Sequence, residues 1–393
     1  MTRVAFTPIG GTHWQGGRNY QLNLLKVLQQ YRPGRISALL FAGPDVTEAE
    51  LSEFREACAC ELHRDPAFDR RRAPQVLRNA LLAGRDAAVS AAFARHRADV
   101  VFESALFFGW RLGVPAIAWM PDFQHRDLPQ LFSRTARLKR EAGFRAQAAA
   151  DRMLMVSSLD SQAACKRHYP GAADRVRAVR FAVPAPAPMA AAAARAVADR
   201  YHLPAHYFCM PNQYWKHKNH RLVVDALALA RQQHGQTFTV IAPGNPNDPR
   251  NPTHWDELQA AVRGAGLQNH FLMPGMIDRA DLAPLLQASD ALLNPSLMEG
   301  WSTTVEEARS AGVPMLLSDL AVHREQAADQ ATYFKRDSAQ SLADVLHAFE
   351  ALGSAQRVAR REAAGNDAQL RLARFADDFV SVVDAAQRRA PAS

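Results

Sequence analysis

Buried strands alternate with helices along this chain, in two series that a proline-rich segment separates. The first series opens with the strand RVAFTPI (3–9), a glycine loop and an amphipathic helix over 19–31. Further apolar strands are expected at ISALLFAG (36–43), ADVVFES (98–104), VPAIAWMPD (114–122) and DRMLMVSS (151–158). Strands that alternate with helices are typical of a parallel, doubly wound sheet. The first series therefore predicts one α/β domain.

The second series follows FAVPAPAPMAAAA (181–193), whose prolines indicate a linker. Its strands are expected at YFCMPN (207–212), TFTVIAP (237–243), HFLMPG (270–275), DALLNPS (290–296) and PMLLSD (314–319). A chain of 393 residues is also longer than one core usually supports. We expect a first domain over 1–183, a linker or hinge over 184–200, a second domain over 201–375, and a helix over 376–393 that packs back on the first domain.

The charge of the chain favours an anionic partner, because the formal net charge is +8 and the pI is about 9.6. A phosphorylated small molecule and an anionic membrane surface fit this charge. A nucleic acid is not expected, since no basic motif interleaved with aromatic residues occurs. The four cysteines lack zinc-site spacing, so a cytoplasmic protein with unreactive thiols is expected. No apolar run approaches the roughly 20 residues of a membrane-spanning helix.

Two polar motifs follow strands at the sheet edge where open α/β sheets bind their ligands. GGTHWQGG (10–17) would let the backbone approach a phosphate or a sugar, and a simple tight turn is the alternative. MPNQYWKHKNHR (210–221) gathers Lys216, His217, Lys218, His220 and Arg221 behind a strand. Clustered cations at that edge suit a diphosphate, and a solvated basic loop is the alternative.

A third motif, NPSLMEGWSTTVEEARSAGVP (294–314), joins a strand to a helix. Thr303 and Glu306 have the spacing of a helix capping box, and Thr304 with Glu307 is an alternative box. Gly312 is placed to end the helix. Glu299 precedes the helix and needs another role. A carboxylate at that position could accept hydrogen bonds from sugar hydroxyls.

These segments resemble the GT4 family of retaining glycosyltransferases. Its signature has the form P-S-x-x-E-G-F-G-x-x-x-x-E-A-x-A-x-G-x-P, and Glu299 and Glu307 occupy the two glutamate positions. HKNHRLVVDAL is similar to the lysine-containing segment of the family, and GGTHWQGG to its glycine loop. WMPDFQHRDLPQLF and SDLAVHREQ are similar to a subset associated with bacterial surface polysaccharide assembly. The resemblance implies the GT-B fold, with two Rossmann-like, doubly wound parallel-sheet domains facing a cleft.

The resemblance also implies roles for individual residues. Glu307 would bind the ribose of the donor nucleotide, Glu299 the donor sugar, and Lys218 the diphosphate. The other donor-site candidates are Gly11, Asn212, Lys216, Met276, Ile277, Gly300, Trp301, Ser302 and Thr303.

Three segments depart from the family pattern. Asn212 stands where relatives have an arginine, and Lys216 is a candidate to supply that charge. Trp301 and Ser302 replace the usual Phe-Gly. In the first domain, Asp122 or His125 would replace a histidine that contacts substrate in many relatives, although a purely structural role for His125 is the alternative.

The implied reaction is transfer of a sugar, with retention, from a nucleotide diphosphate sugar to a hydroxyl of a glycan or lipid-linked acceptor. Its implied setting is bacterial cell-surface polysaccharide synthesis of the O-antigen, capsule or lipopolysaccharide type. A UDP- or GDP-sugar would be the co-substrate, with no cofactor. No metal is expected, because no D-x-D motif stands at a strand end. The alternatives are a nucleotide-sugar epimerase of GT-B type and a non-catalytic sugar- or polyanion-binding module.

The segment FSRTARLKREAGFR (132–145) reads as a basic amphipathic helix, with Phe132, Ala136, Leu138 and Phe144 among arginines and a lysine. An ordinary surface helix is one interpretation. The other is a helix that docks on the anionic inner face of a membrane. We therefore expect a cytoplasmic protein, with peripheral membrane contact as the second interpretation.

Overall fold

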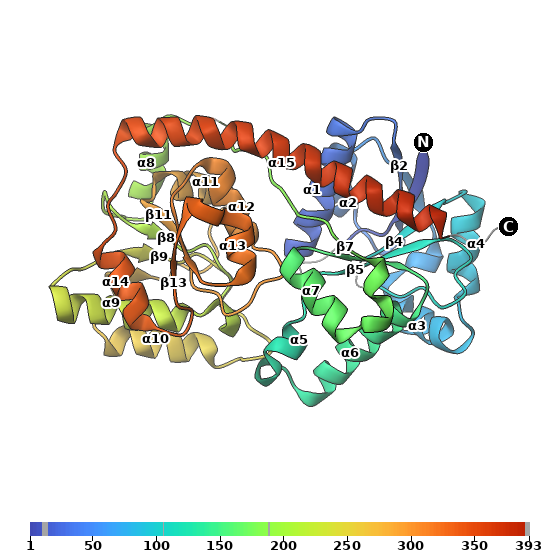
Figure 1. Cartoon of the computed structure of the whole chain (residues 1–393), viewed down its shortest axis with the longest axis horizontal. Coiled ribbons are helices and arrows are strands. Elements are labelled where there is room, and N and C mark those ends of the chain that lie inside the picture. The colour runs from blue at the N-terminus through green and yellow to red at the C-terminus, as the bar shows by residue number, and fades with distance from the viewer. Residues whose placement is uncertain (10–14, 105, 188, 390–393) are drawn as a thin grey trace. The chain divides into compact units, whose positions relative to one another are not determined.

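The computed structural model of the chain describes residues 1–9, 15–104, 106–187 and 189–389. The chain forms two compact units, which are described separately (Figure 1). Unit 1 comprises residues 1–123, 135–182 and 370–393, and unit 2 comprises residues 124–134 and 183–369. The main boundaries between the units thus lie between residues 182 and 183 and between residues 369 and 370. The sequence predicted them after residue 183 and after residue 375.

Unit 1 is built on a parallel sheet with the strand order β3-β2-β1-β4-β5-β6-β7. The strands are β1 (Thr2–Phe6), β2 (Ile36–Ala42), β3 (Glu61–Arg64), β4 (Val100–Ser104), β5 (Ala116–Met120), β6 (Met153–Val156) and β7 (Val176–Ala178). The helices that connect them are α1 (Gln15–Tyr31), α2 (Glu48–Ala57), α3 (Ala73–Leu82), α4 (Ala87–Arg95), α6 (Arg134–Ala149) and α7 (Leu159–His168). The predicted doubly wound parallel sheet is confirmed for this unit.

A buried ion pair anchors the end of β4 in unit 1. Arg152 donates to both carboxylate oxygens of Glu103, at 2.5 and 2.9 Å, and to the carbonyl of Gly109. The same carboxylate accepts the backbone N–H of Phe108 at 2.9 Å. Both charged side chains are almost fully buried, so their mutual hydrogen bonds offset the cost of desolvation. The pair fixes the segment that follows β4 against the sheet.

The last part of α15 (Ser354–Arg388) completes the core of unit 1. Its residue Phe379 is fully buried, with its ring 6.2 Å from that of Phe6 and 5.7 Å from that of Phe102. Arg32 of the α1–β2 turn pairs with Asp377 of the same helix. Residues far apart in the sequence therefore form one core.

The basic helix predicted over 132–145 corresponds to α6, but its apolar residues do not form one exposed face. Phe144 is buried against Phe123, with ring centroids 5.7 Å apart, whereas Leu138 is 70% exposed. Phe132 precedes the helix and lies in unit 2. No helix in the described part of the chain is long and apolar enough to cross a membrane.

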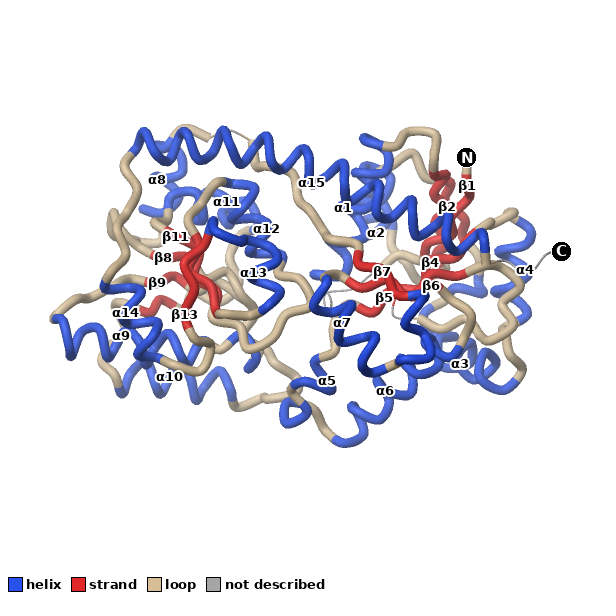
Figure 2. The backbone as a smooth tube through the Cα atoms, in the orientation of Figure 1, coloured by secondary structure: helices blue, strands red, loops and turns tan. Residues whose placement is uncertain are grey.

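Unit 2 has a second parallel sheet, with the strand order β10-β9-β8-β11-β12-β13. Figure 2 labels β8, β9, β11 and β13 of this sheet. The strands are β8 (Phe208–Cys209), β9 (Val240–Ile241), β10 (Phe271–Leu272), β11 (Ala291–Asn294), β12 (Met315–Ser318) and β13 (Ala331–Phe334). The helices are α5 (Gln124–Asp127), α8 (Ala191–Arg200), α9 (His220–His234), α10 (His254–Gly264), α11 (Arg279–Ala288), α12 (Thr303–Ala311), α13 (Ala321–Ala327), α14 (Ala339–His347) and the first part of α15.

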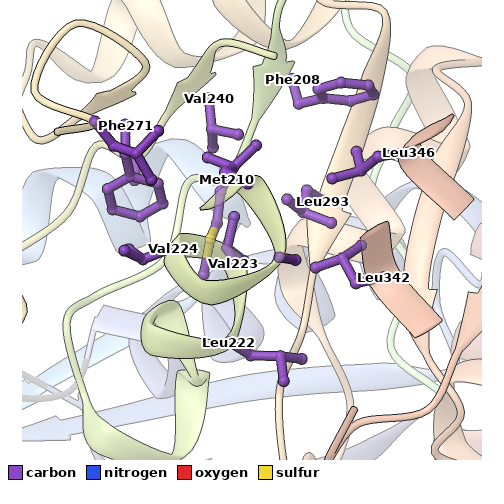
Figure 3. Close-up of a cluster of buried hydrophobic side chains, with 14 of the residues drawn as sticks. Phe208, Met210, Leu222, Val223, Val224, Val240, Phe271, Leu293, Leu342 and Leu346 are labelled. Atoms are coloured by element: carbon purple, nitrogen blue, oxygen red, sulfur yellow. The ribbon is translucent and has the colours of Figure 1, made fainter. Parts of the chain in front are cut away.

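The core on one side of this sheet combines strand and helix side chains. Leu293 of β11 lies between residues of α9, such as Val223, and residues of α14, such as Leu342 and Leu346 (Figure 3). These side chains are fully buried. Fully buried parallel strands read as continuous apolar runs, which is why the strands of this unit stand out in the sequence.

Helix α8 falls within the segment assigned to a linker, 184–200. It packs on α11 through Tyr201, whose hydroxyl donates to Asp281 at 2.7 Å, and Arg200 pairs with the same carboxylate. The last ten residues of that segment therefore form a helix of unit 2.

Residues 124–134 also belong to unit 2, although the chain on both sides of them belongs to unit 1. Arg250 holds this segment. Its guanidinium lies 5.1 Å from the ring centroid of Phe132 and 5.2 Å from that of Trp215, and it donates to the side chain of Gln124 at 3.4 Å. Asp248 accepts from its Nε at 3.2 Å and fixes its orientation.

The close packing of α12 and α15 gives a stability prediction. Gly312 ends α12 with φ +67°, and an added Cβ would lie 2.8 Å from the backbone of Arg360 and Arg361. Gly312→Ala should therefore combine a left-handed backbone cost of about 1 kcal/mol with an overpacking cost of about 1–3 kcal/mol. Urea unfolding measures the sum.

The matched control is Gly235→Ala. Gly235 ends α9 with φ +66°, and an added Cβ would meet nothing within 4 Å. This variant should lose only about 1 kcal/mol. Equal losses in the two variants would contradict the close packing at Gly312.

Candidate active site

The candidate site lies at the carboxyl ends of β8 and β11. The strand order runs outward from this pair in both directions, through β9 to β10 and through β12 to β13. The boundary between β8 and β11 is therefore the switch point of the sheet, where open α/β sheets bind their ligands. The basic segment after β8 and the glutamate-containing segment after β11 meet here.

Lys218 and Glu299 form an ion pair at this edge. Lys218 Nζ lies 2.6 Å from Glu299 Oε1, and the side chains are only 14% and 7% exposed. Ser296 Oγ donates to the same Oε1 at 2.7 Å. Oε2 of Glu299 accepts no hydrogen bond from the residues that the structure describes. One oxygen is thus committed to the protein, and the other can accept a bond from a ligand.

Asn294, the last residue of β11, organises the turn that carries Glu299. Its Oδ1 accepts the backbone N–H of Ser296 at 3.2 Å, and its Nδ2 donates to the hydroxyls of Ser302 and Thr304 at 3.0 and 3.2 Å. All these bonds are buried or half-buried, so they fix the turn relative to the strand.

The start of α12 is set by Gln326 of α13. Gln326 Oε1 accepts the backbone N–H of Ser302, and its Nε2 donates to the Ser302 carbonyl, each at 3.0 Å. Ser302 is the N-cap residue, and its side chain makes no capping hydrogen bond. The side chain of the N-cap residue thus leaves the first N–H groups of α12 uncapped, and a helix start of this kind can bind an anion.

The predicted capping box is wrong. The helix begins at Thr303 after Ser302, so neither Thr303 nor Thr304 is the N-cap residue. With Ser302 as the N-cap, Glu306 is not the N3 residue of a capping box. Its fully buried side chain lies beside Gln326, with Nε2 and Oε1 3.5 Å apart. Gln326 makes the hydrogen bonds to the backbone at the start of the helix. The predicted end of the helix at Gly312 is confirmed.

Glu307 is the next residue on α12, and its side chain is exposed where that of Glu306 is buried. Desolvation by the surrounding protein nevertheless raises the pKa of its carboxyl to about 7, and the nearby charge of Arg279 opposes that rise. Burial and the nearby charge of Glu307 raise the pKa of Cys209 to about 12. Since Cys209 ends β8, the Glu307 carboxylate lies near the carboxyl end of that strand. Of the two residues expected to meet the base, Met276 is 61% exposed and Ile277 packs against the core of unit 2.

The loop that carries Lys218 is fixed by Asn219, which has φ +58°. Its side-chain Nδ2 donates to the carbonyl of Pro295 at 3.1 Å and to that of Arg336 at 2.9 Å. The left-handed backbone is one that asparagine tolerates well. Asn219 thus joins the segment of Lys218 to the turn between Asn294 and Glu299.

The basic segment does not present all its side chains to a ligand. His217 and His220 are buried, and burial is the main cause that lowers the pKa of His220 to about 3 and holds that of His217 well below its usual value. Arg221 pairs on the surface with Asp225. Lys216 is exposed, and its backbone N–H donates to Asp248 at 3.2 Å. Lys216 and Lys218 are therefore the cations of this segment available to a diphosphate.

Asn212 lies behind this segment with 3% exposure. Its Nδ2 finds no hydrogen-bond partner within the part of the chain that the structure describes. A buried amide donor without a partner is costly, and a ligand oxygen would relieve that cost. The proposed compensation of Asn212 by Lys216 stays a prediction.

His323 is a component of the site that the sequence analysis did not single out by itself. It is fully buried, and its Nδ1 donates to the Ser318 carbonyl at 2.9 Å, so Nε2 is the acceptor nitrogen. Burial lowers its pKa, while the nearby charge of Glu299 opposes that shift. Nε2 has no partner among the described residues. His323 lies in the motif SDLAVHREQ, which the sequence had pointed to. Only the structure shows that the His323 side chain is buried near Glu299.

The first-domain candidates have different surroundings. Asp122, in unit 1, accepts from Arg140 at 2.7 Å. His125 is buried in α5 of unit 2, within the segment held by Arg250. Gly11, with His13 and Trp14 of the glycine loop, lies outside the described residues. Substrate contacts of Asp122, His125 and Gly11 stay predictions.

Residues 203–368 match the model of the family "Glycosyl transferases group 1". This part of the chain is therefore similar to group 1 glycosyl transferases. That match spans nearly all of unit 2, which holds the Lys218–Glu299 pair. A search of curated proteins gives no significant match.

Solved glycosyltransferases share the fold of the whole chain. A glycosyltransferase from Rickettsia africae ESF-5 is similar with a TM-score of 0.71 and 13% identity, over 99% of each chain. HepE from Anabaena, in complex with UDP and glucose, has a TM-score of 0.68 and 16% identity, over 98% of this chain and 100% of that one. WaaG, a glycosyltransferase involved in lipopolysaccharide biosynthesis, has a TM-score of 0.60 and 15% identity, over 100% of both chains. The predicted GT-B fold is confirmed.

The partly buried ion pair gives a second prediction. Lys218→Met leaves the Glu299 carboxylate largely buried without its cation, which should lower the free energy of unfolding by about 2–4 kcal/mol. Adding Glu299→Gln removes the unpaired charge and should recover at least half of that loss. Denaturant unfolding of both single variants and the double variant measures the coupling. Additive losses would mean that the two side chains do not interact.

The buried histidines give a third prediction, on pH. The folded state keeps His217 and His220 neutral, whereas the unfolded chain protonates them below its ordinary pKa near 6.5. Stability is therefore present above pH 6.5 and is lost as the pH falls toward 5, by up to about 2 kcal/mol per histidine. His220→Phe should reduce this slope, and His234→Phe, at an exposed position, should leave it unchanged. Equal slopes in the wild type and His220→Phe would contradict the assignment.

Proposed function

We propose that the protein is a retaining glycosyltransferase that moves a sugar from a nucleotide diphosphate sugar to a hydroxyl of a glycan or lipid-linked acceptor. The observation that carries the proposal is the Lys218–Glu299 pair, held at the switch point of a domain that is similar to group 1 glycosyl transferases, beside the start of α12. The structures of HepE with UDP, UDP and glucose, and UDP-glucose support a uridine nucleotide as the donor.

Each part of the site has a task in this reaction. The departing diphosphate gains negative charge, which Lys218, Lys216 and the N–H groups at the start of α12 would stabilise. Oε2 of Glu299 would accept a hydrogen bond from a hydroxyl of the donor sugar. Glu307, exposed near β8, would accept hydrogen bonds from the ribose hydroxyls. Fixed cations and helix N–H groups supply this stabilisation, so we propose that transfer proceeds without a metal.

The ion pair also explains how the site is kept ready. The ammonium group of Lys218 has three N–H donors. One of them donates to Glu299, and the other two can donate to phosphate oxygens. Ser296 and Asn219 hold the two segments in place before any ligand arrives. A preformed site avoids much of the ordering cost of binding.

The biological setting we propose is the synthesis of bacterial cell-surface polysaccharide, at the inner face of the membrane. The support is the similarity in fold to WaaG, which is involved in lipopolysaccharide biosynthesis, and to the lipopolysaccharide outer core galactosyltransferase WaaB. The net charge of +8 is compatible with work beside an anionic surface.

A thermal-shift screen with UDP, GDP and their sugars identifies the donor, because a ligand that binds only the folded state raises the melting temperature. The selected donor is then incubated with candidate acceptors, and the anomeric configuration of the product is read by NMR. Retention in a metal-free buffer supports the proposal. Inversion, or turnover that EDTA abolishes, would overturn the corresponding part of it. Conversion of the donor to its epimer without an acceptor would favour the epimerase alternative.

The two glutamates should fail in different ways. Glu307→Ala should weaken nucleotide binding about 10-fold or more, because it removes the carboxyl group that would accept hydrogen bonds from the ribose hydroxyls. Glu299→Gln should leave UDP affinity within about 3-fold and lower kcat by about 100-fold or more, because it acts on the sugar. Calorimetry with UDP and steady-state kinetics separate the two effects.

Glu350→Ala is the matched control, since Glu350 is an exposed glutamate of unit 2 away from α12. It should change neither quantity. If Glu299→Gln and Glu307→Ala both behave like this control, the site assignment is wrong.

A further inference from the structure

An apolar groove of about 830 Å³ lies in unit 1, at the carboxyl ends of β1, β2 and β4. Residues 7–9 follow β1, Gly43 follows β2 and Ser104 ends β4, and all of them line the groove. The strand order reverses between β1 and β4, so the groove occupies the switch point of this sheet. Its volume is within the range of small-molecule sites.

One wall of the groove consists of exposed leucines. Leu77, Leu81 and Leu82 on α3 are 40%, 46% and 82% exposed, and Leu106 beyond β4 is 37% exposed. These four are among the few large apolar side chains that the described chain leaves open to solvent. A contiguous exposed apolar surface of this kind marks a binding site.

Packed aromatic side chains line the floor of the groove. Phe41 and Phe68 pack with their ring centroids 5.0 Å apart. Phe108 is held by its backbone N–H to the buried Glu103 carboxylate, which Arg152 fixes in turn. The groove is therefore a preformed feature of the fold.

The rim of the groove carries a surplus of positive charge. Arg78 and Lys139 line it, are exposed, and have no carboxylate partner among the described residues. Arg70 also lines it but pairs with Glu50 and Asp45. Asp69 is the carboxylate of the lining, and its oxygen accepts the backbone N–H of Arg71 at 2.9 Å. The two unpaired cations suit an anionic head group next to an apolar chain.

We propose that this groove binds a single lipid molecule with an extended hydrocarbon chain and a phosphate-type head group. The chain lies along the leucines of α3, and the head group meets Arg78 and Lys139. A free sugar would leave the leucines exposed, and a neutral apolar molecule would leave the cations unused. The identification of this lipid as the acceptor rests on the proposed function, whereas its binding requires no donor.

Calorimetry on the full chain tests the binding with octyl, decyl and dodecyl phosphate, each below its critical micelle concentration. Each added methylene buried in the groove should tighten binding about fourfold. Octyl phosphate should bind better than octyl glucoside, which has a neutral head. Inorganic phosphate alone should bind at least tenfold more weakly than dodecyl phosphate. A lack of dependence on chain length would overturn the proposal.

Two variants separate chain from head. Leu77→Ser with Leu81→Ser should weaken dodecyl phosphate binding at least tenfold and flatten the dependence on chain length. Arg78→Gln with Lys139→Gln should abolish the preference for octyl phosphate over octyl glucoside while that dependence persists. The controls are Leu370→Ser on α15 and Arg167→Gln on α7, both exposed in unit 1 outside the groove lining. Equal losses in the controls would overturn the assignment.

Binding of UDP in the same samples distinguishes this inference from the proposed function. All four groove side chains are exposed, so the variants should fold and should keep the UDP affinity of the wild type. If the protein binds UDP but no alkyl phosphate, the proposal of a lipid site in the groove is wrong and the proposed function is unaffected. Chain-length-dependent alkyl phosphate binding without binding of any nucleotide would count against the proposed function alone. Binding only to anionic vesicles, and not to monomeric alkyl phosphate, would replace the lipid site by a membrane-docking surface.

Discussion

The pairing of Lys218 with Glu299 is the interaction on which the organisation of unit 2 around the site depends. Two mostly buried opposite charges are stable only where geometry and further hydrogen bonds offset their desolvation. Here the Ser296 hydroxyl supplies such a bond, and Asn294 fixes Ser296 by accepting its backbone N–H. Asn219 joins the two segments that carry the charges. The short strand ends, the left-handed asparagine and the serine-rich turn are thus parts of one arrangement.

The same arrangement distinguishes neighbouring glutamates by their surroundings. Glu299 shares one oxygen with the protein and keeps the other open, Glu306 is enclosed beside Gln326, and Glu307 reaches solvent. Three carboxylates within nine residues therefore have three different environments. Their chemistry follows from the side of the turn or helix on which each one lies.

The central strands of both sheets could be predicted from the sequence, because burial on two faces requires continuous apolar runs. The edge strands β3, β7 and β13 could not, although the edge strand β10 could. β3 has the sequence ELHR with no buried residue, and β7 and β13 each have one. A strand with one neighbour needs little apolar surface, so its sequence resembles that of a loop. The sequence also could not predict that residues 124–134 belong to unit 2, because their placement depends on contacts with Arg250, more than a hundred residues away.

At the site, spacing predicted residue types better than their contacts. The segments that carry Lys218 and Glu299 were predicted at the correct strand ends. The ion pair between the two side chains could not be predicted, because only the folded structure brings them together. The capping box failed because Gln326, from the next helix, binds both backbone groups of Ser302. The basic segment seemed to be a cluster of five charges, but burial keeps His217 and His220 neutral and Asp225 engages Arg221. A local pattern cannot show which neighbours tertiary structure will bring.

The contribution of α15 to unit 1 has a consequence for how the protein is made. The core around Phe6 and Phe102 is closed by Phe379, almost at the end of the chain. A ribosome synthesises chains from the N-terminus at about 5–20 residues per second, and domains tend to fold as they emerge. Unit 2 can form while unit 1 still lacks its last helix. Nearly two hundred residues beyond Val183 must be translated before Phe379 is available. During that time the aromatic face of the first sheet stays exposed, and a chaperone could bind it.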